Sequence, residues 1–194
     1  MLITGKKGWL PENFSLHGDN PVYEPGELEG KLLYCDDFTG YQENEPRPEV
    51  FEKFMRLLRN AYEDPKKRKG QDLIRYFEEI HVIWIIDKAS DEICNNRRGI
   101  DLIKLLEISY EWVISSESPE LVKLGIALMG MMNLNGWEEC KEAIVTLGKY
   151  SEFTFYSLYA ISGWQNAEVI ARDYAANLKG WGKRHADEWL SCEA

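Results

Sequence analysis

The sequence predicts an all-α protein, in which antiparallel helix hairpins stack into an irregular α-solenoid or bundle. Three observations support this fold class. Apolar residues recur at intervals of three and four from Val50 onward, as on one face of a helix. The run Ser-Pro-Glu at 118–120 is a strong signal for the start of a helix. In the C-terminal part, a Gly-Trp pair followed by a helical pattern occurs three times, with Trp137, Trp164 and Trp181.

Residues 1–45 differ from the rest, and we expect a largely irregular segment that packs on the helical body. Closely spaced prolines and glycines leave little room for long helices there. Its apolar piece at 31–35 is compatible with an extended segment. The segment carries six aromatic residues: Trp9, Phe14, Tyr23, Tyr34, Phe38 and Tyr41. This content favours packing over a mobile arm.

We expect one helical domain over residues 46–194. Its first helix begins near Pro48, since proline is tolerated in the first helical turn, and ends at the basic loop 64–70. A second helix follows, with an apolar stripe formed by Leu73, Phe77, Ile80 and Trp84. The run 81–86 alone could be a buried strand, because it is rich in β-branched residues. The periodic pattern begins well before this run, however, and therefore favours a helix.

A third helix is expected near residues 100–114. The residues expected on one face of it are Ile103, Leu106, Tyr110 and Val113. Cys94 and Cys140 are expected at apolar helical positions, where a thiol behaves as a small hydrophobic group.

The helix after Ser118 is expected to lie at the centre of the protein. Residues 121–134 are apolar on nearly every side, interrupted by Lys123, and such a helix is buried by several neighbours. Gly125 and Gly130 each weaken a helix by about 1 kcal/mol relative to alanine. We expect close approach of a neighbouring helix to compensate. The stretch is too short to cross a bilayer, which requires about 20 residues.

The three Gly-Trp pairs are expected at the joints of helix hairpins. Glycine can end a helix in the left-handed conformation, and the following tryptophan can then pack on both helices of the hairpin. Between the first two pairs we predict a helix capped by Ser151. Its expected inward residues are Phe155, Leu158, Tyr159 and Ile161.

Helix lengths, short loops and the Gly-Trp pairs make residues 95–194, or in a wider interpretation 46–194, resemble HEAT- and armadillo-type helical repeat proteins. The resemblance implies a concave surface that binds other proteins. Repeats of those families are longer and more regular, about 40–47 residues. An irregular helical bundle is therefore the competing architecture.

Charge and cysteine usage restrict the classes of function and partner. With 33 Asp and Glu against 23 Lys and Arg, the net charge is −10. This balance argues against a nucleic-acid partner, whose binding relies on Lys and Arg, and favours solubility and a basic protein partner. The four cysteines form no Cys-x-x-Cys pair, and the N-terminus has no apolar signal core. We therefore expect a cytoplasmic protein with free buried thiols and no membrane partner. No pattern indicates an oligomeric state.

No motif in the chain predicts catalytic chemistry, a metal ion or a cofactor. The sequence has no nucleophile elbow, Walker loop or dinucleotide-binding glycine motif. One Glu-x-x-His, Glu78 with His81, lacks the second copy that a di-iron bundle needs, and we interpret His81 as a core-edge residue beside Trp84. A metal site would need a loop that folds back to join four N-terminal residues: His17, Cys35, Asp36 and Asp37.

The last helix combines an aromatic stripe with a charged face. Trp181, His185 and Trp189 are spaced at i, i+4 and i+8, while Lys183–Asp187 and Arg184–Glu188 are i, i+4 ion pairs. These features describe an amphipathic terminal helix. Alternatively, part of this helix flanks a binding groove. The candidate binding residues are Trp164, Trp181, Arg184, His185, Glu138 and Glu142.

We therefore predict a non-catalytic protein-binding helical-repeat module. A narrower alternative is an immunity-type inhibitor, a small acidic helical protein that neutralises a basic toxin; strong salt dependence would favour it. The remaining alternative is an enzyme or ligand-binding protein with a pocket between helices, where a carboxylate and a histidine such as His185 converge.

Overall fold

The computed structural model describes residues 23–35, 47–95 and 99–192, and in these ranges the protein is helical without any strand. The all-α prediction is confirmed. The described α-helices are α1 (Glu27–Tyr34), α3 (Pro48–Glu63), α4 (Gln71–Tyr76), α5 (Ile86–Cys94), α6 (Leu102–Ser115), α7 (Pro119–Gly130), α8 (Glu138–Leu147), α9 (Ser151–Ile161), α10 (Ala167–Asn177) and α11 (Gly180–Cys192).

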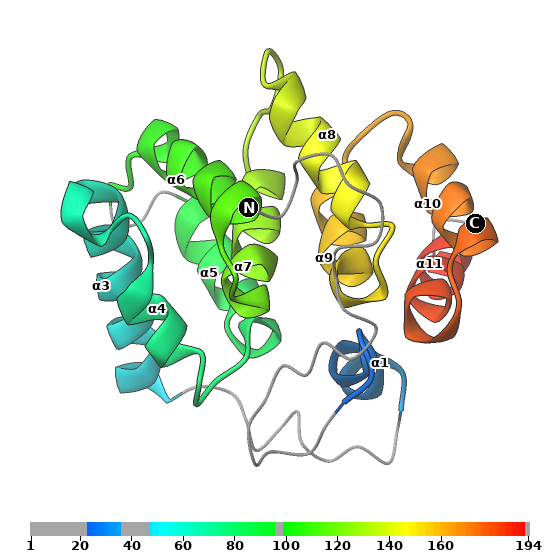
Figure 1. The fold of residues 1–194 in the computed structure, drawn as a ribbon, viewed down its shortest axis with the longest axis horizontal. Helices are drawn as coiled ribbons and strands as arrows, with labels where there is room; N and C mark the ends of the chain where they lie inside the picture. Colours follow the sequence, from blue (N-terminus) through cyan, green and yellow to red (C-terminus); the bar gives the residue numbers. More distant parts are fainter. Residues whose placement is uncertain (1–22, 36–46, 96–98, 193–194) are drawn as a thin grey trace.

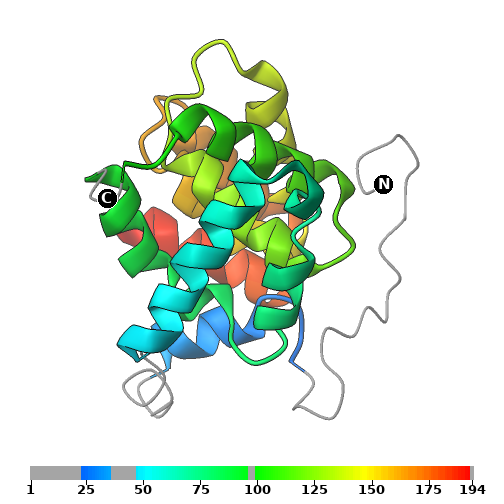
Figure 2. The same ribbon diagram turned by 90° about the vertical axis from the view of Figure 1, so that its left-hand side faces the viewer.

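The helices follow one another across the molecule from α3 at one end to α10 and α11 at the other (Figure 1). Helix α7 packs between α6 and α9, and α11 packs against both α9 and α10. Helix α3 covers α6 at one end of the stack, where it lies across the front in Figure 2. Helix α1 lies across one side and contacts α11, at the opposite end of the chain. The core is therefore built around α7, with ten buried residues among its twelve.

The local start signals are confirmed at α3 and α7 and wrong at α9. Pro48 occupies the first turn of α3. At α7, the Ser118 hydroxyl accepts a hydrogen bond from the Leu121 amide at 3.4 Å. The residue before α9 is Tyr150, and Ser151 donates its hydroxyl to the carbonyl of Lys179 at 3.5 Å instead of capping the helix.

The prediction of one continuous helix through residues 71–86 is wrong, because helical structure is interrupted between α4 and α5. A 3₁₀ helix, Val82–Trp84, fills the gap. In a continuous helix the consecutive apolar residues of this stretch would point in all directions, whereas the break lets Val82, Ile85 and Ile86 all become buried. The freed amide of Val82 donates to the carboxylate of Glu120 at 2.8 Å, so the break leaves this buried N–H paired. His81 packs edge-on against Trp84 at 4.8 Å between ring centroids, as expected.

Helix α6 has the expected extent but presents a slightly different face. Ile103, expected inside, is 67% exposed. The buried face instead includes Trp112. Its indole N–H donates to the carbonyl of Arg68 at 2.6 Å, and this hydrogen bond holds the basic loop against α6. Cys94 is exposed, contrary to expectation, whereas Cys140 is buried.

The expected close approaches at the α7 glycines are confirmed. A methyl group at Gly125 would lie 2.8 Å from the carbonyl oxygen of Ser109 on α6. At Gly130 a methyl group would overlap the backbone of Ala160 on α9. Glycine at these positions lets two neighbouring backbones approach α7 more closely than alanine would allow.

A helix replaces the extended piece that we expected near residues 31–35. Helix α1 buries Leu28 and Leu32 against Ile83 in a small apolar cluster. It begins after Gly26, which has a positive φ of 78° and where a methyl group would lie only 2.6 Å from the carbonyl oxygen of Ser151. Of the six N-terminal aromatics, four lie outside the described residues: Trp9, Phe14, Phe38 and Tyr41. The described part of the segment thus packs on the body.

Candidate functional site

The six candidate binding residues fall in two separate places. Glu138, Glu142 and Trp164 line one groove. Trp181, Arg184 and His185 lie instead at the contact between α11 and α1.

The groove lies between the loops that join α7 to α8 and α9 to α10, and we call it the corner groove. Its volume is about 920 Å³. Each of the two loops contains a Gly-Trp pair: Gly136 has a positive φ of 87° before Trp137, whereas Gly163 before Trp164 does not. The lining residues are Met132, Asn133, Leu134, Asn135, Glu138, Lys141, Glu142, Val145, Thr146, Gly163, Trp164, Gln165, Asn166 and Ile170.

The corner groove combines an aromatic anchor with a rim of amides. Trp164 is half-buried and packs against the main core, so its ring is held in place. The exposed amide side chains are Asn133, Asn135, Gln165 and Asn166. Each amide supplies both donors and an acceptor, the combination that pairs with a peptide backbone.

The charged residues of the corner groove are predominantly acidic. Glu138 and Glu142 are both exposed. Lys141 pairs with Glu138 at 2.9 Å, which leaves the carboxylate of Glu142 as the excess charge of the lining. The groove therefore favours a cationic occupant.

At the α1–α11 contact, the predicted residues hold α1. The ring of Trp181 lies against Gly30, where even a methyl group would overlap it. The guanidinium of Arg184 lies over the rings of Trp181 and Tyr34, at 5.1 and 5.5 Å from their centroids. These side chains are engaged within the chain and form no open groove with Trp164. The expected ion pairs of α11 are present, Arg184–Glu188 at 3.7 Å and Lys183–Asp187 at 3.0 Å.

His185 is fully buried and hydrogen bonded on both sides of its ring. Nε2 donates to the carbonyl of Gly26 at 2.9 Å, and Nδ1 accepts from the Tyr34 hydroxyl at 3.1 Å. Burial lowers the pKa of His185 below its ordinary value, which favours the neutral ring. This histidine thus acts as a structural link to α1.

Sequence reasoning missed a buried charge cluster centred on Lys123 of α7, which it treated as an interruption of an apolar run. The ammonium lies 2.8 Å from Glu29 of α1, 3.0 Å from Glu120 of α7 and 2.5 Å from Glu152 of α9. The hydroxyl of Tyr156 donates to Glu29 at 3.2 Å. We call these residues the Lys123 cluster. The signal available in the sequence was a lysine inside a helix that had to be buried on all sides.

The carboxyls of the Lys123 cluster differ in their pKa values. Burial disfavours ionisation of Glu120, but Lys123, His81 and the Val82 amide outweigh it and lower the pKa to about 2. Burial and the charge of Glu29 outweigh Lys123 at Glu152 and raise its pKa to about 7. Despite burial, the carboxylates raise the pKa of Lys123 well above its ordinary value.

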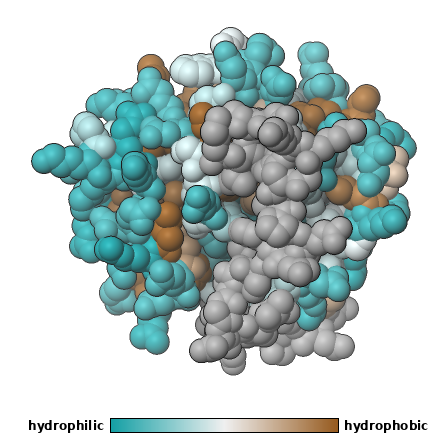
Figure 3. All heavy atoms as spheres, in the orientation of Figure 1, coloured by the Kyte–Doolittle hydropathy of each residue, from teal (hydrophilic) through white to brown (hydrophobic). Residues whose placement is uncertain are grey.

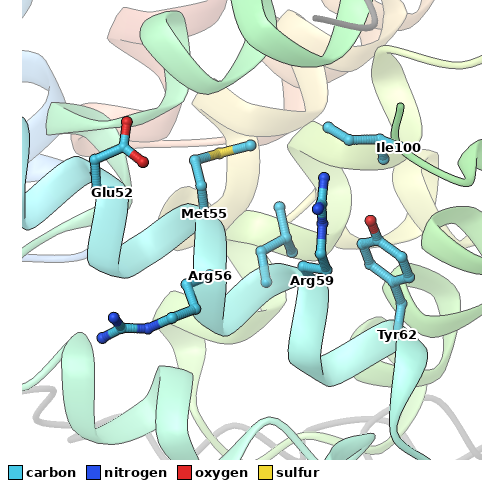
Figure 4. A pocket seen from close by; sticks show the side chains of 7 residues that line it. Glu52, Met55, Arg56, Arg59, Tyr62 and Ile100 are labelled. Carbon is cyan, nitrogen blue, oxygen red and sulfur yellow. The ribbon is translucent and has the colours of Figure 1, made fainter. Parts of the chain in front are cut away.

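A second cavity, of about 360 Å³, lies beside α3 (Figure 4). It is lined by Glu52, Met55, Arg56, Leu58, Arg59, Tyr62 and Ile100. Neither this cavity nor the corner groove is lined by a histidine. A carboxylate and a histidine do approach each other, Glu120 and His81 at 3.6 Å, but both belong to the buried interior beside Lys123.

In the described ranges, no group of three or more His, Cys, Asp and Glu residues is arranged to hold a metal ion. Three of the residues that we considered for a folded-back site, His17, Asp36 and Asp37, lie outside those ranges. No described helix has both the length and the apolar composition of a membrane span.

Outside the grey atoms, the face of the molecule in Figure 3 is largely hydrophilic with scattered apolar residues.

Comparisons of the chain with models of protein families, with curated proteins and with solved structures find no match. The candidate site therefore rests on the geometry and chemistry described above.

Proposed function

We propose that the protein is a non-catalytic protein-binding module that holds a basic, extended segment of a partner protein in the corner groove. The observation that carries the proposal is the composition of this groove: a fixed tryptophan, a rim of amides and an excess carboxylate line one open depression. Helical-repeat proteins bind partners along surfaces made by successive helix pairs, and here the two loops and α8 build the groove.

The amide rim and Trp164 favour an extended peptide segment. Amides from the two loops, such as Asn135 and Gln165, can pair with the donors and acceptors of an extended peptide backbone, which forms no internal hydrogen bonds. Trp164 offers a rigid apolar surface, and tryptophan is enriched among residues that dominate binding energy.

The charge of the groove selects a basic segment. Glu138 and Glu142 outnumber Lys141 in the lining, and the whole chain carries a net charge of −10. Like charge repels an acidic segment, and complementary charge accelerates the encounter with a basic one. An immunity-type inhibitor of a basic toxin would be a special case of this binding mode, recognised by a tight complex that weakens strongly with added salt.

A cytoplasmic location accords with this proposal. All four cysteines are free thiols, although Cys35, Cys94, Cys140 and Cys192 differ widely in exposure. Disulfides are rare in the reducing cytosol and common outside it.

Binding of defined probe peptides tests the function. A fluorescent peptide of alternating Lys and Leu is expected to bind, and its counterpart of alternating Glu and Leu is not. Because Trp164 is the anchor, Trp164→Ala should weaken binding of the basic peptide by about thirtyfold, equivalent to about 2 kcal/mol. Fluorescence anisotropy measures both affinities.

A charge-matched pair of variants separates the groove from general attraction. Glu142→Lys changes the groove, whereas Glu78→Lys makes the same change at an exposed residue after α4, outside the groove lining. We expect a clear loss with the first and nearly unchanged affinity with the second. Equal losses would mean that the peptide responds to net charge alone, which would contradict binding in the corner groove.

A further inference from the structure

The Lys123 cluster holds more negative charge than positive charge in a buried place. The exposed fractions are 1% for Glu29, 4% for Glu120, 2% for Lys123 and 7% for Glu152. Three carboxylates thus surround one ammonium. Buried charges without compensation are costly, and a carboxyl in that situation takes up a proton instead.

The other titratable groups around the cluster do not remove the excess. His81 lies 3.6 Å from Glu120, so even a charged His81 would leave the three carboxylates one negative charge in excess. From α11, burial lowers the pKa of His185, which disfavours a compensating positive charge on its ring. From α9, the hydroxyl of Tyr156 contributes a hydrogen bond to Glu29 but no charge, since burial raises its pKa well above the ordinary value.

Of the three carboxyls, Glu152 is the one placed to carry the proton. Glu120 accepts from the Val82 amide and from Lys123, and Glu29 accepts from Lys123 and Tyr156. Glu152 faces the same ammonium with no second donor among the described hydrogen bonds. The raised pKa of Glu152, about 7, agrees with its having fewer hydrogen-bond donors than Glu120 and Glu29.

The excess charge depends on α1, because Glu29 enters the cluster with that helix. Helix α1 has eight residues and is joined to α3 through residues 36–46. Its further contacts with α11 include the packing of Trp181 on Gly30 and the hydrogen bond between Tyr34 and His185. When α1 leaves, one negative charge leaves too, and Lys123 then faces only two carboxylates. Glu152 is then stabilised in its ionised form and releases its proton.

We propose that docking of α1 onto α7, α9 and α11 takes up one proton, carried by Glu152, so that α1 is held more weakly as the pH rises. Undocking would uncover Lys123, Tyr156 and His185, which α1 now covers. The chain would therefore present a different surface at high and low pH.

The direction of the pH effect follows from the pKa of Glu152, which is higher in the docked protein than its ordinary value of 4.5. The stabilisation by the proton is complete below that ordinary value and is lost as the pH rises through about 7. His185 acts in the opposite direction, because its lowered pKa favours docking as the pH rises. Variants at Glu152 isolate the proposed proton from this opposing contribution.

Amide hydrogen exchange of α1, corrected for the intrinsic pH dependence, measures docking directly. The variant Glu152→Gln imitates the protonated carboxyl, so its α1 should stay docked as the pH rises. Between about pH 5 and pH 7, we expect the ratio of α1 protection factors, variant over wild type, to rise towards tenfold per pH unit, the limit for one linked proton. Exposed Glu138→Gln is the matched control and should leave the ratio at one.

A second variant, at Glu29, tests the linked proton without changing Glu152 itself. Glu29→Gln removes one of the three negative charges around Lys123 while keeping an acceptor for Lys123 and Tyr156, and its α1 protection should also lose its pH dependence relative to wild type. Protection of α8, which packs on α9 and α6, should be unchanged in both variants. A constant ratio between wild type and both variants across the pH range would overturn the proposal.

Discussion

Replacing Lys123 with methionine is expected to lower the free energy of unfolding at neutral pH by about 3–5 kcal/mol, since it leaves buried carboxylates without their cation. The loss should shrink as the pH falls, because protonation of Glu152, whose pKa is raised to about 7, relieves the repulsion in the cluster. Urea denaturation followed by circular dichroism measures both the loss and its pH dependence.

The control for this variant is Lys141→Met. Lys141 also pairs with a carboxylate, Glu138, but its side chain is 28% exposed and that of Glu138 is 76% exposed, against 3% for Lys123. Exposed ion pairs contribute about 0–1 kcal/mol, so the control should remain nearly as stable as wild type. Similar losses in the two variants would show that the Lys123 cluster does not join α1, α7 and α9.

The second large effect is expected at Gly130. Substitution with alanine puts a methyl group into the backbone of Ala160, which cannot rotate away as a side chain could. Helices α7 and α9 must then separate, and we expect a loss of about 2–3 kcal/mol in the free energy of unfolding, within the usual range for overpacking. Thermal denaturation gives the shift in melting temperature.

Gly163→Ala provides the comparison, because no atom lies within 4 Å of the added methyl group and the backbone there has no positive φ. Its stability should stay within about 0.5 kcal/mol of wild type. If Gly130→Ala were equally harmless, the close packing of α7 on α9 would be contradicted.

The sequence predicted the parts of the fold that local signals control. Pro48 and Ser118 mark helix starts through their own backbone and side-chain chemistry, and both predictions are confirmed. The break after α4 has a distant cause: the carboxylate of Glu120 pairs with the amide of Val82, 38 residues away. No periodicity in residues 71–86 contains that information.

Part of the candidate site could likewise be predicted from local signals, and part could not. Glu138, Glu142 and Trp164 lie near repeated Gly-Trp corners, and stacking of successive hairpins brings such corners together. Trp181 and His185 lie on an equally regular aromatic stripe, but α1 covers it. Helix α1 lies about 150 residues before α11 in the chain. The closely spaced glycines and prolines around it led us to expect irregular structure there instead of a helix.

Mapping the bound peptide on the protein tests the central claim, that the corner groove is the binding surface. In nuclear magnetic resonance spectra of isotope-labelled protein, the alternating Lys and Leu peptide should shift the amide signals of residues 132–146 and 163–170 and the indole signal of Trp164. Shifts concentrated instead on the α1–α11 contact, or around Arg56 and Tyr62 in the cavity beside α3, would contradict it.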